Sequence, residues 1–223
     1  MLMTRISLFS LALFGSLGAQ EEPLEIATYS SEEITPILPL LQDWVEREFL
    51  KYPYLWVAPK GTIYTPNERL MEDERGLAAV VKRENEVVAV FCCIPFDSVA
   101  LEPSLQPLLS TVKEKWFDPS RMLYIPYFLS LEDIRNDERA IYSIYQHLLE
   151  HAKQTGCHQI CVMEALGQPN HLLRPDSFIA LEPWGKLGFE KMDIELEITW
   201  PTLQVDGSIC EEAHTMVFLY KNI

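Results

Sequence analysis

The chain has 223 residues, of which 48% are hydrophobic and 23% charged, which suits a globular protein of one domain or of one domain with a short extension. Its formal net charge of −15 argues against sequence-independent binding to nucleic acid and against binding to anionic lipid, because both need a basic surface. We therefore expect no nucleic-acid partner.

The N-terminal segment has the layout of a secretory signal peptide. Arg5 precedes the apolar run Ile6–Leu17, which is too short to span a bilayer, and Ser16 and Gly18 are small residues of the kind that a signal peptidase reads. The sequence predicts a leader over residues 1–18, a domain over residues 24–223 and export to the periplasm or the exterior, without stable membrane association beyond the leader. The alternative is a cytoplasmic protein with a mis-assigned start.

The five cysteines favour buried small hydrophobic side chains over a metal site. Cys92 and Cys93 are neighbours in an apolar, strand-like run, so their side chains point to opposite faces and cannot line one metal site. The cysteine and histidine spacings do not match a zinc motif. We expect no metal.

The first half of the chain predicts a strand, a helix and a hairpin. Ile26–Tyr29 is a short strand, and an amphipathic helix follows, with Thr35 as its N-cap. Tyr52–Pro66 is rich in proline and aromatic residues and predicts a loop. Leu77–Val81 and Val87–Ile94 are β-rich runs separated by a polar turn, which predicts a hairpin.

The second half predicts a strand–helix–strand unit and a closing pair of strands. Met122–Leu131 is a long apolar strand, the apolar stripe of Ile141–Ala152 predicts a helix, and His158–Met163 is the next strand. Lys191–Trp200 and Thr215–Tyr220 alternate like two antiparallel strands. Without repeats or linkers, these elements predict one compact α/β (α+β) domain.

The block from Met122 to Phe189 resembles the Gcn5-related N-acetyltransferases (GNAT). It runs strand, turn, helix and strand, and it ends in Lys186-Leu-Gly-Phe-Glu, which is similar to the closing motif of that family. The resemblance covers roughly residues 25 to 223. It implies a mixed, mostly antiparallel central sheet flanked by helices, with two splayed parallel strands, Met122–Leu131 and His158–Met163.

The resemblance implies an acyl-CoA-dependent N-acyltransferase with acetyl-CoA as cosubstrate. The acetyl group would pass directly, in a ternary complex, to a primary amine of a small molecule or peptide. Backbone groups of Phe128, Leu129 and Ser130 would pair with the pantetheine arm. The pyrophosphate would lie on backbone N–H groups at the start of the following helix, where the helix dipole and unsatisfied donors converge.

One departure from the family pattern concerns this phosphate loop. Relatives use Arg/Gln-x-x-Gly-x-Gly/Ala, in which glycine lets the backbone approach phosphate. A loop starting at Arg135 ends at Ala140 and has Glu138 at a glycine position, whereas a loop starting at Arg139 has Tyr142 there. Arg135 and Arg139 would then serve as phosphate ligands instead.

A second departure is Trp184, which stands where many relatives have the Tyr that protonates the leaving thiolate. An indole N–H is not acidic. Glu164 is the first candidate for the general base that takes the amine proton, and His171 is the second. The candidates for the missing acid are the nearby tyrosines, with Tyr127 taken as the catalytic one: Tyr124, Tyr127, Tyr142 and Tyr145.

The alternative function is a catalytically degenerate protein of this fold that is exported and acts as a binding or interaction module. The missing glycines, the missing Tyr and the leader favour it, because acetyl-CoA is scarce outside the cytoplasm. An unrelated α/β hydrolase is disfavoured, because the sequence has no Gly-x-Ser-x-Gly elbow.

Overall fold

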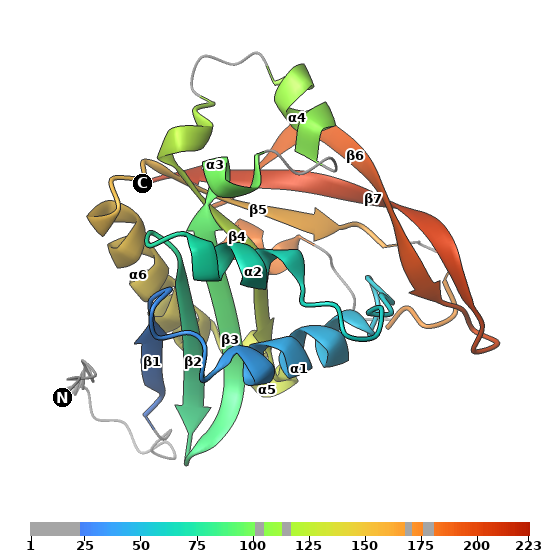
Figure 1. Cartoon of the computed structure of the whole chain (residues 1–223), viewed down its shortest axis with the longest axis horizontal. Helices are drawn as coiled ribbons and strands as arrows, with labels where there is room; N and C mark the ends of the chain where they lie inside the picture. Colours follow the sequence, from blue (N-terminus) through green and yellow to red (C-terminus); the bar gives the residue numbers. More distant parts are fainter. Residues whose placement is uncertain (1–22, 101–104, 113–116, 168–170, 176–180) are drawn as a thin grey trace.

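A computed structural model describes residues 23–100, 105–112, 117–167, 171–175 and 181–223 (Figure 1). The predicted leader, residues 1–18, lies outside the described residues. Among the described residues, no helix combines the length and the apolar character that a membrane span requires.

The described residues form a seven-stranded sheet in the order β1-β2-β3-β4-β5-β7-β6 (Figure 1). Every neighbouring pair is antiparallel except β4 and β5, which are parallel. The predicted mixed sheet, the hairpin and the closing strand pair are thus confirmed. The strands are β1 (Glu25–Tyr29), β2 (Leu77–Arg83), β3 (Glu86–Pro95), β4 (Met122–Ser130), β5 (Gln159–Ala165), β6 (Glu190–Leu203) and β7 (Ile209–Asn222).

Helices cover both faces of the sheet, because the central strands are apolar on both sides. One face carries α1 (Leu38–Phe49), α2 (Thr65–Glu72), α3 (Phe96–Val99) and α4 (Gln106–Thr111). The other carries α5 (Glu132–Asn136), α6 (Glu138–Gln154) and α7 (Glu182–Lys186). A short 3-10 helix, η2 (Pro119–Arg121), leads into β4.

The two cores separate neighbouring residues of the same strand. Cys92 belongs to the core under α1 to α4, and Cys93 belongs to the core under α5 to α7, as strand alternation predicts. All five cysteines are free, and four of them are buried.

Three helix boundaries differ from the sequence predictions. The predicted N-cap at Thr35 is wrong, because α1 begins at Leu38 with Ile37 as its N-cap. Pro39 then lies in the first turn, where its missing N–H leaves no bond unmade. Helix α2 begins inside the segment predicted as loop, and α5 occupies the polar segment that follows β4.

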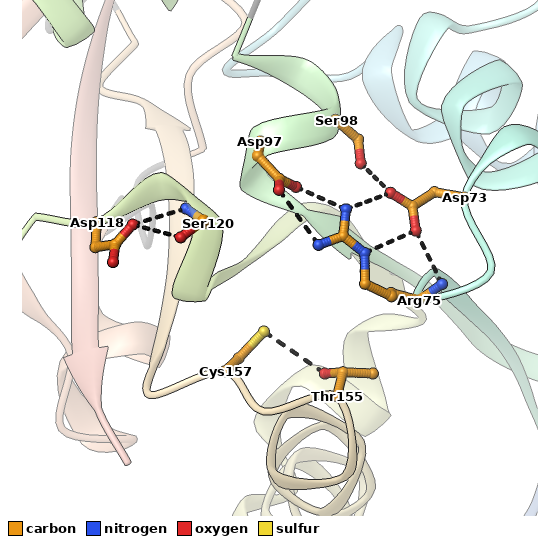
Figure 2. A network of polar contacts seen from close by, with 8 residues as sticks. All are labelled: Asp73, Arg75, Asp97, Ser98, Asp118, Ser120, Thr155 and Cys157. Carbon is orange, nitrogen blue, oxygen red and sulfur yellow. Dashed lines mark hydrogen bonds and ion pairs between the residues drawn. The ribbon is translucent and has the colours of Figure 1, made fainter.

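An ion-pair network ties the chain before β2 to α3 (Figure 2), and a hydrogen bond extends it to α6. Arg75 Nη2 lies 2.8 Å from Asp73 Oδ2 and 2.9 Å from Asp97 Oδ1, and Ser98 Oγ donates to Asp73. His151 Nε2 on α6 donates to the Arg75 carbonyl at 2.7 Å. The network braces the end of the sheet at which β4 begins.

Candidate active site

β4 and β5 run side by side for only part of their length. Their parallel register ends at the pair Ile125 and Val162, although β4 continues to Ser130 and β5 to Ala165. The next residue, Pro126, has no N–H to offer a neighbouring strand. The predicted splay of these two strands is confirmed.

A β-bulge lies at the same point of β4. Cys92 pairs with Tyr127 and Ile94 pairs with Tyr124, so Ile125 and Pro126 of β4 together face the single β3 residue between them. A bulge bends and twists the strand that carries the extra residue. The bend turns the end of β4 away from β5.

A cleft of about 1540 Å³ opens where the two strands part. Its wall includes the end of α1 and the loop after it, the end of β4, part of β5, and residues of α5, α6 and α7. Helices of both faces of the sheet thus meet the cleft, which is lined by the three residues predicted to contact the pantetheine arm: Phe128, Leu129 and Ser130.

Glu164, near the end of β5, lines this cleft and accepts two hydrogen bonds. Tyr54 Oη donates to Oε2 at 2.8 Å, and Trp184 Nε1 donates to Oε1 at 2.6 Å. Tyr54 packs on the core under α1, whereas Trp184 belongs to α7 on the opposite face. The carboxylate is therefore held in one orientation from both sides of the gap.

The loop that carries Tyr54 is fixed against β6. Trp200 Nε1 donates to the Tyr54 carbonyl at 2.8 Å, and the Leu203 N–H donates to the Leu55 carbonyl at 2.8 Å. On its other side the loop packs on Gly167, where a Cβ would lie only 2.6 Å from Cζ of Tyr52. The position of the Tyr54 hydroxyl thus depends on contacts with β6 and with the chain after β5.

Burial raises the pKa of the Glu164 carboxyl above its ordinary value, and the hydrogen bonds from Trp184 and Tyr54 offset only part of this rise. Burial, followed by the nearby Glu164 charge, raises the pKa of the Tyr54 hydroxyl well above its ordinary value, so this hydroxyl stays a donor. A carboxyl with a raised pKa and a fixed orientation is suited to proton transfer near neutral pH.

The raised pKa predicts a pH-dependent stability. Because folded Glu164 holds its proton more tightly than the unfolded chain does, its stabilising contribution is complete below the ordinary value of 4.5 and is lost as the pH rises through the raised value. Glu164→Gln removes this dependence, so the unfolding free energy of the variant relative to wild type should rise over the pH range that starts at 4.5 and extends upward. Urea unfolding across this range measures it, and parallel curves for the two proteins would contradict it.

The other two catalytic candidates have different surroundings. Tyr127 lines the cleft, but its hydroxyl donates to Asn67 Oδ1 at 2.7 Å, and burial raises its pKa well above the ordinary value. His171 does not line the cleft in the described part of the chain. Its Nδ1 accepts the N–H of Leu173 at 3.1 Å, and its ring centroid lies 6.0 Å from that of Tyr52. Glu164 and Tyr127 are brought together at the cleft, and His171 is not.

The start of α6 is capped by the chain itself. Asp137 is the N-cap, and its Oδ1 accepts the backbone N–H of Arg139 at 2.9 Å and that of Ala140 at 3.1 Å. Of the two predicted phosphate loops, the one that starts at Arg135 leads into this helix start. The one that starts at Arg139 lies within the helix, which begins at Glu138.

The predicted donor site therefore fits its ligand at one end only. Phe128, Leu129 and Ser130 line the cleft beyond the splay, although the Ser130 carbonyl accepts a hydrogen bond from Arg135 Nη2 at 2.9 Å. This stretch of β4 suits an amide-bearing arm. The start of α6 does not suit a diphosphate in the same way, because Asp137 already occupies two of its amides.

Solved structures with this arrangement of elements are acetyltransferases. A probable acetyltransferase from Staphylococcus epidermidis has a TM-score of 0.55 at 12% identity, covering 90% of this chain and 99% of its own. The ribosomal-protein-alanine N-acetyltransferase from Brucella melitensis has a TM-score of 0.54 at 16% identity, covering 89% of this chain and 99% of its own. The chain has the GNAT fold. YncA from Salmonella typhimurium, solved with its cofactor acetyl-CoA, has a TM-score of 0.51 at 11% identity, covering 89% of this chain and 93% of its own.

No protein-family model and no curated protein matches the sequence. The likeness to the GNAT structures therefore establishes the fold, and the function must be argued from the site.

Three features of this GNAT-fold site go beyond the sequence predictions: Tyr54, Pro126 and the Asp137 cap. Pro126 inside an apolar strand is a readable signal, because proline within sheets is confined to edges, first residues and bulges. Asp137 just before a helical stripe is an N-cap signal. Tyr54 carries no local signal, because its position depends on distant parts of the chain.

Proposed function

We propose that this protein is an acyl-CoA-dependent N-acyltransferase that transfers an acetyl group to a primary amine. The observation that carries the proposal is the gap between β4 and β5 with the Glu164 carboxylate held beside it. The GNAT fold supports it, since N-acetyltransferases share that fold and YncA holds acetyl-CoA as its cofactor.

In the proposed reaction the amine nitrogen bonds to the thioester carbonyl carbon, and the carbon–sulfur bond breaks. Glu164 takes the proton from the amine. The leaving thiolate takes its proton from water, because the Trp184 N–H is not acidic and already donates to Glu164. Direct transfer needs no enzyme nucleophile, which is consistent with burial raising the pKa of the Cys161 thiol well above its ordinary value.

We propose a small-molecule or peptide amine as the acceptor. The Brucella relative is named for acetylating an alanine of a ribosomal protein, which is a peptide amine. The net charge of −15 would draw a cationic amine toward the protein. The cationic amine first gives one proton to water and becomes a nucleophile, and Glu164 takes the second proton as the nitrogen bonds to the carbonyl carbon.

Titration calorimetry with acetyl-CoA tests the proposal, followed by acetyl transfer to a panel of polyamines and short peptides. We expect saturable binding and transfer to at least one amine. Absence of both heat and a thermal shift at millimolar acetyl-CoA would contradict the proposal.

The capped start of α6 and the indole at Trp184 favour a second candidate, a binding module that keeps the fold without the chemistry. It would hold a ligand in the same cleft. Robust acetyl transfer by the purified protein rules it out.

We also propose export, on the strength of the predicted leader alone. The proposal expects the mature protein to begin near Ala19. N-terminal sequencing of protein recovered from the periplasm or the medium tests this, and an intact N-terminus on a cytoplasmic protein contradicts it.

A further inference from the structure

The two ends of the predicted donor site differ in the hydrogen-bonding groups that are available to a ligand. On β4, residues beyond Pro126 have left β5, and Phe128 and Leu129 line the cleft. A chain that carries amides can pair with such an unpaired strand edge, as a peptide does when it adds to a sheet. This end is open to the pantetheine arm of an acyl donor.

At the other end, the Asp137 carboxylate already makes the contacts that a phosphate oxygen would make. Its Oδ1 lies 2.9 Å from the Arg139 nitrogen and 3.1 Å from the Ala140 nitrogen. These are charge-assisted hydrogen bonds at a helix N-terminus, where a negative charge is favourable. A diphosphate can bond to the same amides only after the carboxylate has left them.

The side chains around this helix start also disfavour a diphosphate. Glu132 and Glu138 line the cleft, and Glu138 directly follows Asp137 in the chain. Arg135 donates to the Ser130 carbonyl at 2.9 Å, and Lys186 Nζ lies 3.3 Å from Glu138 Oε1. Two cations at this mouth thus contact the protein, whereas the Arg139 side chain lines the cleft without an ion pair or hydrogen bond to the described residues.

We propose that the donor site binds the acyl-pantetheine arm of its ligand and does not bind a diphosphate, so that the Asp137 carboxylate takes the place of that group. The class of donor is then any acyl thioester of pantetheine, with or without a nucleotide. This proposal rests on the proposed acyltransferase function, because it concerns the donor of that reaction.

Two donors separate the contributions of the arm and the diphosphate. Acetyl-CoA carries both groups, whereas S-acetylpantetheine carries the arm alone. Titration calorimetry on the wild-type protein should give dissociation constants within about threefold of each other. A diphosphate held by two charge-assisted hydrogen bonds would instead favour acetyl-CoA by on the order of 100-fold, and that result overturns the proposal.

Substitutions at Asp137 test the same point from the protein side. Asp137→Gly frees the two amides and keeps a residue that helix starts tolerate, so acetyl-CoA should bind on the order of tenfold more tightly while S-acetylpantetheine is unaffected. Asp137→Asn keeps the cap and removes the charge, so it should gain less. Equal affinities for acetyl-CoA in wild type and in Asp137→Gly would overturn the proposal.

Asp118→Gly is the matched control. Asp118 is also an N-cap aspartate, and its carboxylate accepts the Ser120 N–H at 3.1 Å, but it precedes β4 and lies at the other end of that strand (Figure 2). The change in charge is the same, and the affinity for either donor should not change. An equal gain in this variant would trace the effect to net charge and overturn the proposal.

Failure of the function and failure of this inference give different results. If neither donor binds to wild type or to Asp137→Gly, the proposed acyltransferase function is wrong and the inference is wrong with it. If acetyl-CoA binds wild type at least tenfold more tightly than S-acetylpantetheine does, the function stands and the inference alone is wrong.

Discussion

Replacing Glu164 by Gln is expected to lower kcat/KM for acetyl transfer by about 10²- to 10⁴-fold, the usual contribution of a positioned general base. The amide has almost the same shape as the carboxylate, but it cannot take a proton from the amine. The affinity for the acyl donor should not change, because donor binding depends on β4 and not on this carboxylate. Steady-state kinetics and donor titration on the same preparation measure both quantities.

Glu150→Gln is the control for this substitution. Glu150 lines the same cleft, and its Oε1 accepts a hydrogen bond from Gln154 Nε2 at 3.3 Å, whereas Glu164 bonds to Tyr54 and Trp184. This variant should keep wild-type kinetics. Full activity in Glu164→Gln would show that another group is the base.

Tyr54→Phe and Trp184→Phe each remove one hydrogen bond from Glu164 and leave its carboxylate in place. Both hydrogen bonds lower the pKa of the carboxyl, so each variant should raise that pKa and move the acidic limb of the kcat/KM profile to higher pH. The loss of activity at high pH should be about tenfold, from poorer orientation. An unmoved acidic limb would argue against Glu164 as the titrating group.

The second large effect is expected on stability. Phe96 is fully buried, and its ring meets those of Phe117, Tyr124 and Phe218 edge-on, at centroid distances of 5.8, 5.9 and 5.8 Å. Phe96→Ala leaves a cavity at this junction and should lower the free energy of unfolding by about 3–5 kcal/mol. Domains are usually stable by about 5–15 kcal/mol, so this is a large share.

Urea unfolding measures this loss, with Tyr142→Ala as the control. The Tyr142 side chain is 60% exposed, so its removal should change the free energy of unfolding by less than about 0.5 kcal/mol. A loss of under about 1 kcal/mol in Phe96→Ala would mean that the core refills the space.

The sequence predicted the individual strands because each carries its own apolar pattern, whereas the mixed sheet and its parallel pair were implied by the resemblance to the GNAT family. The apolar pattern alone predicts a strand at Met122–Leu131 and another at Lys191–Trp200, whatever elements lie beside them. The helix start at Leu38 was missed, because Thr35 and the proline after it look like a start. Pro39 in a first turn is equally compatible with a helix, and only the packing decides between the two.

The site was less predictable, because its contacts join distant residues. Tyr54 reaches Glu164 across 110 positions, and no local pattern encodes that pairing. The sequence showed that Glu138 stands at a glycine position of the family's phosphate loop when that loop starts at Arg135. It did not predict that Asp137 would bond to the amides itself, which depends on where the helix begins.

Pro126 also bears on whether the cleft is open to a ligand. A cleft that opened by separating two paired strands would be open in only a fraction of molecules, and the apparent affinity would fall by that fraction. Here the missing N–H and the bulge keep β4 and β5 apart in the free protein. The cleft is therefore already open in the free protein, and entry of a ligand breaks no hydrogen bonds between β4 and β5.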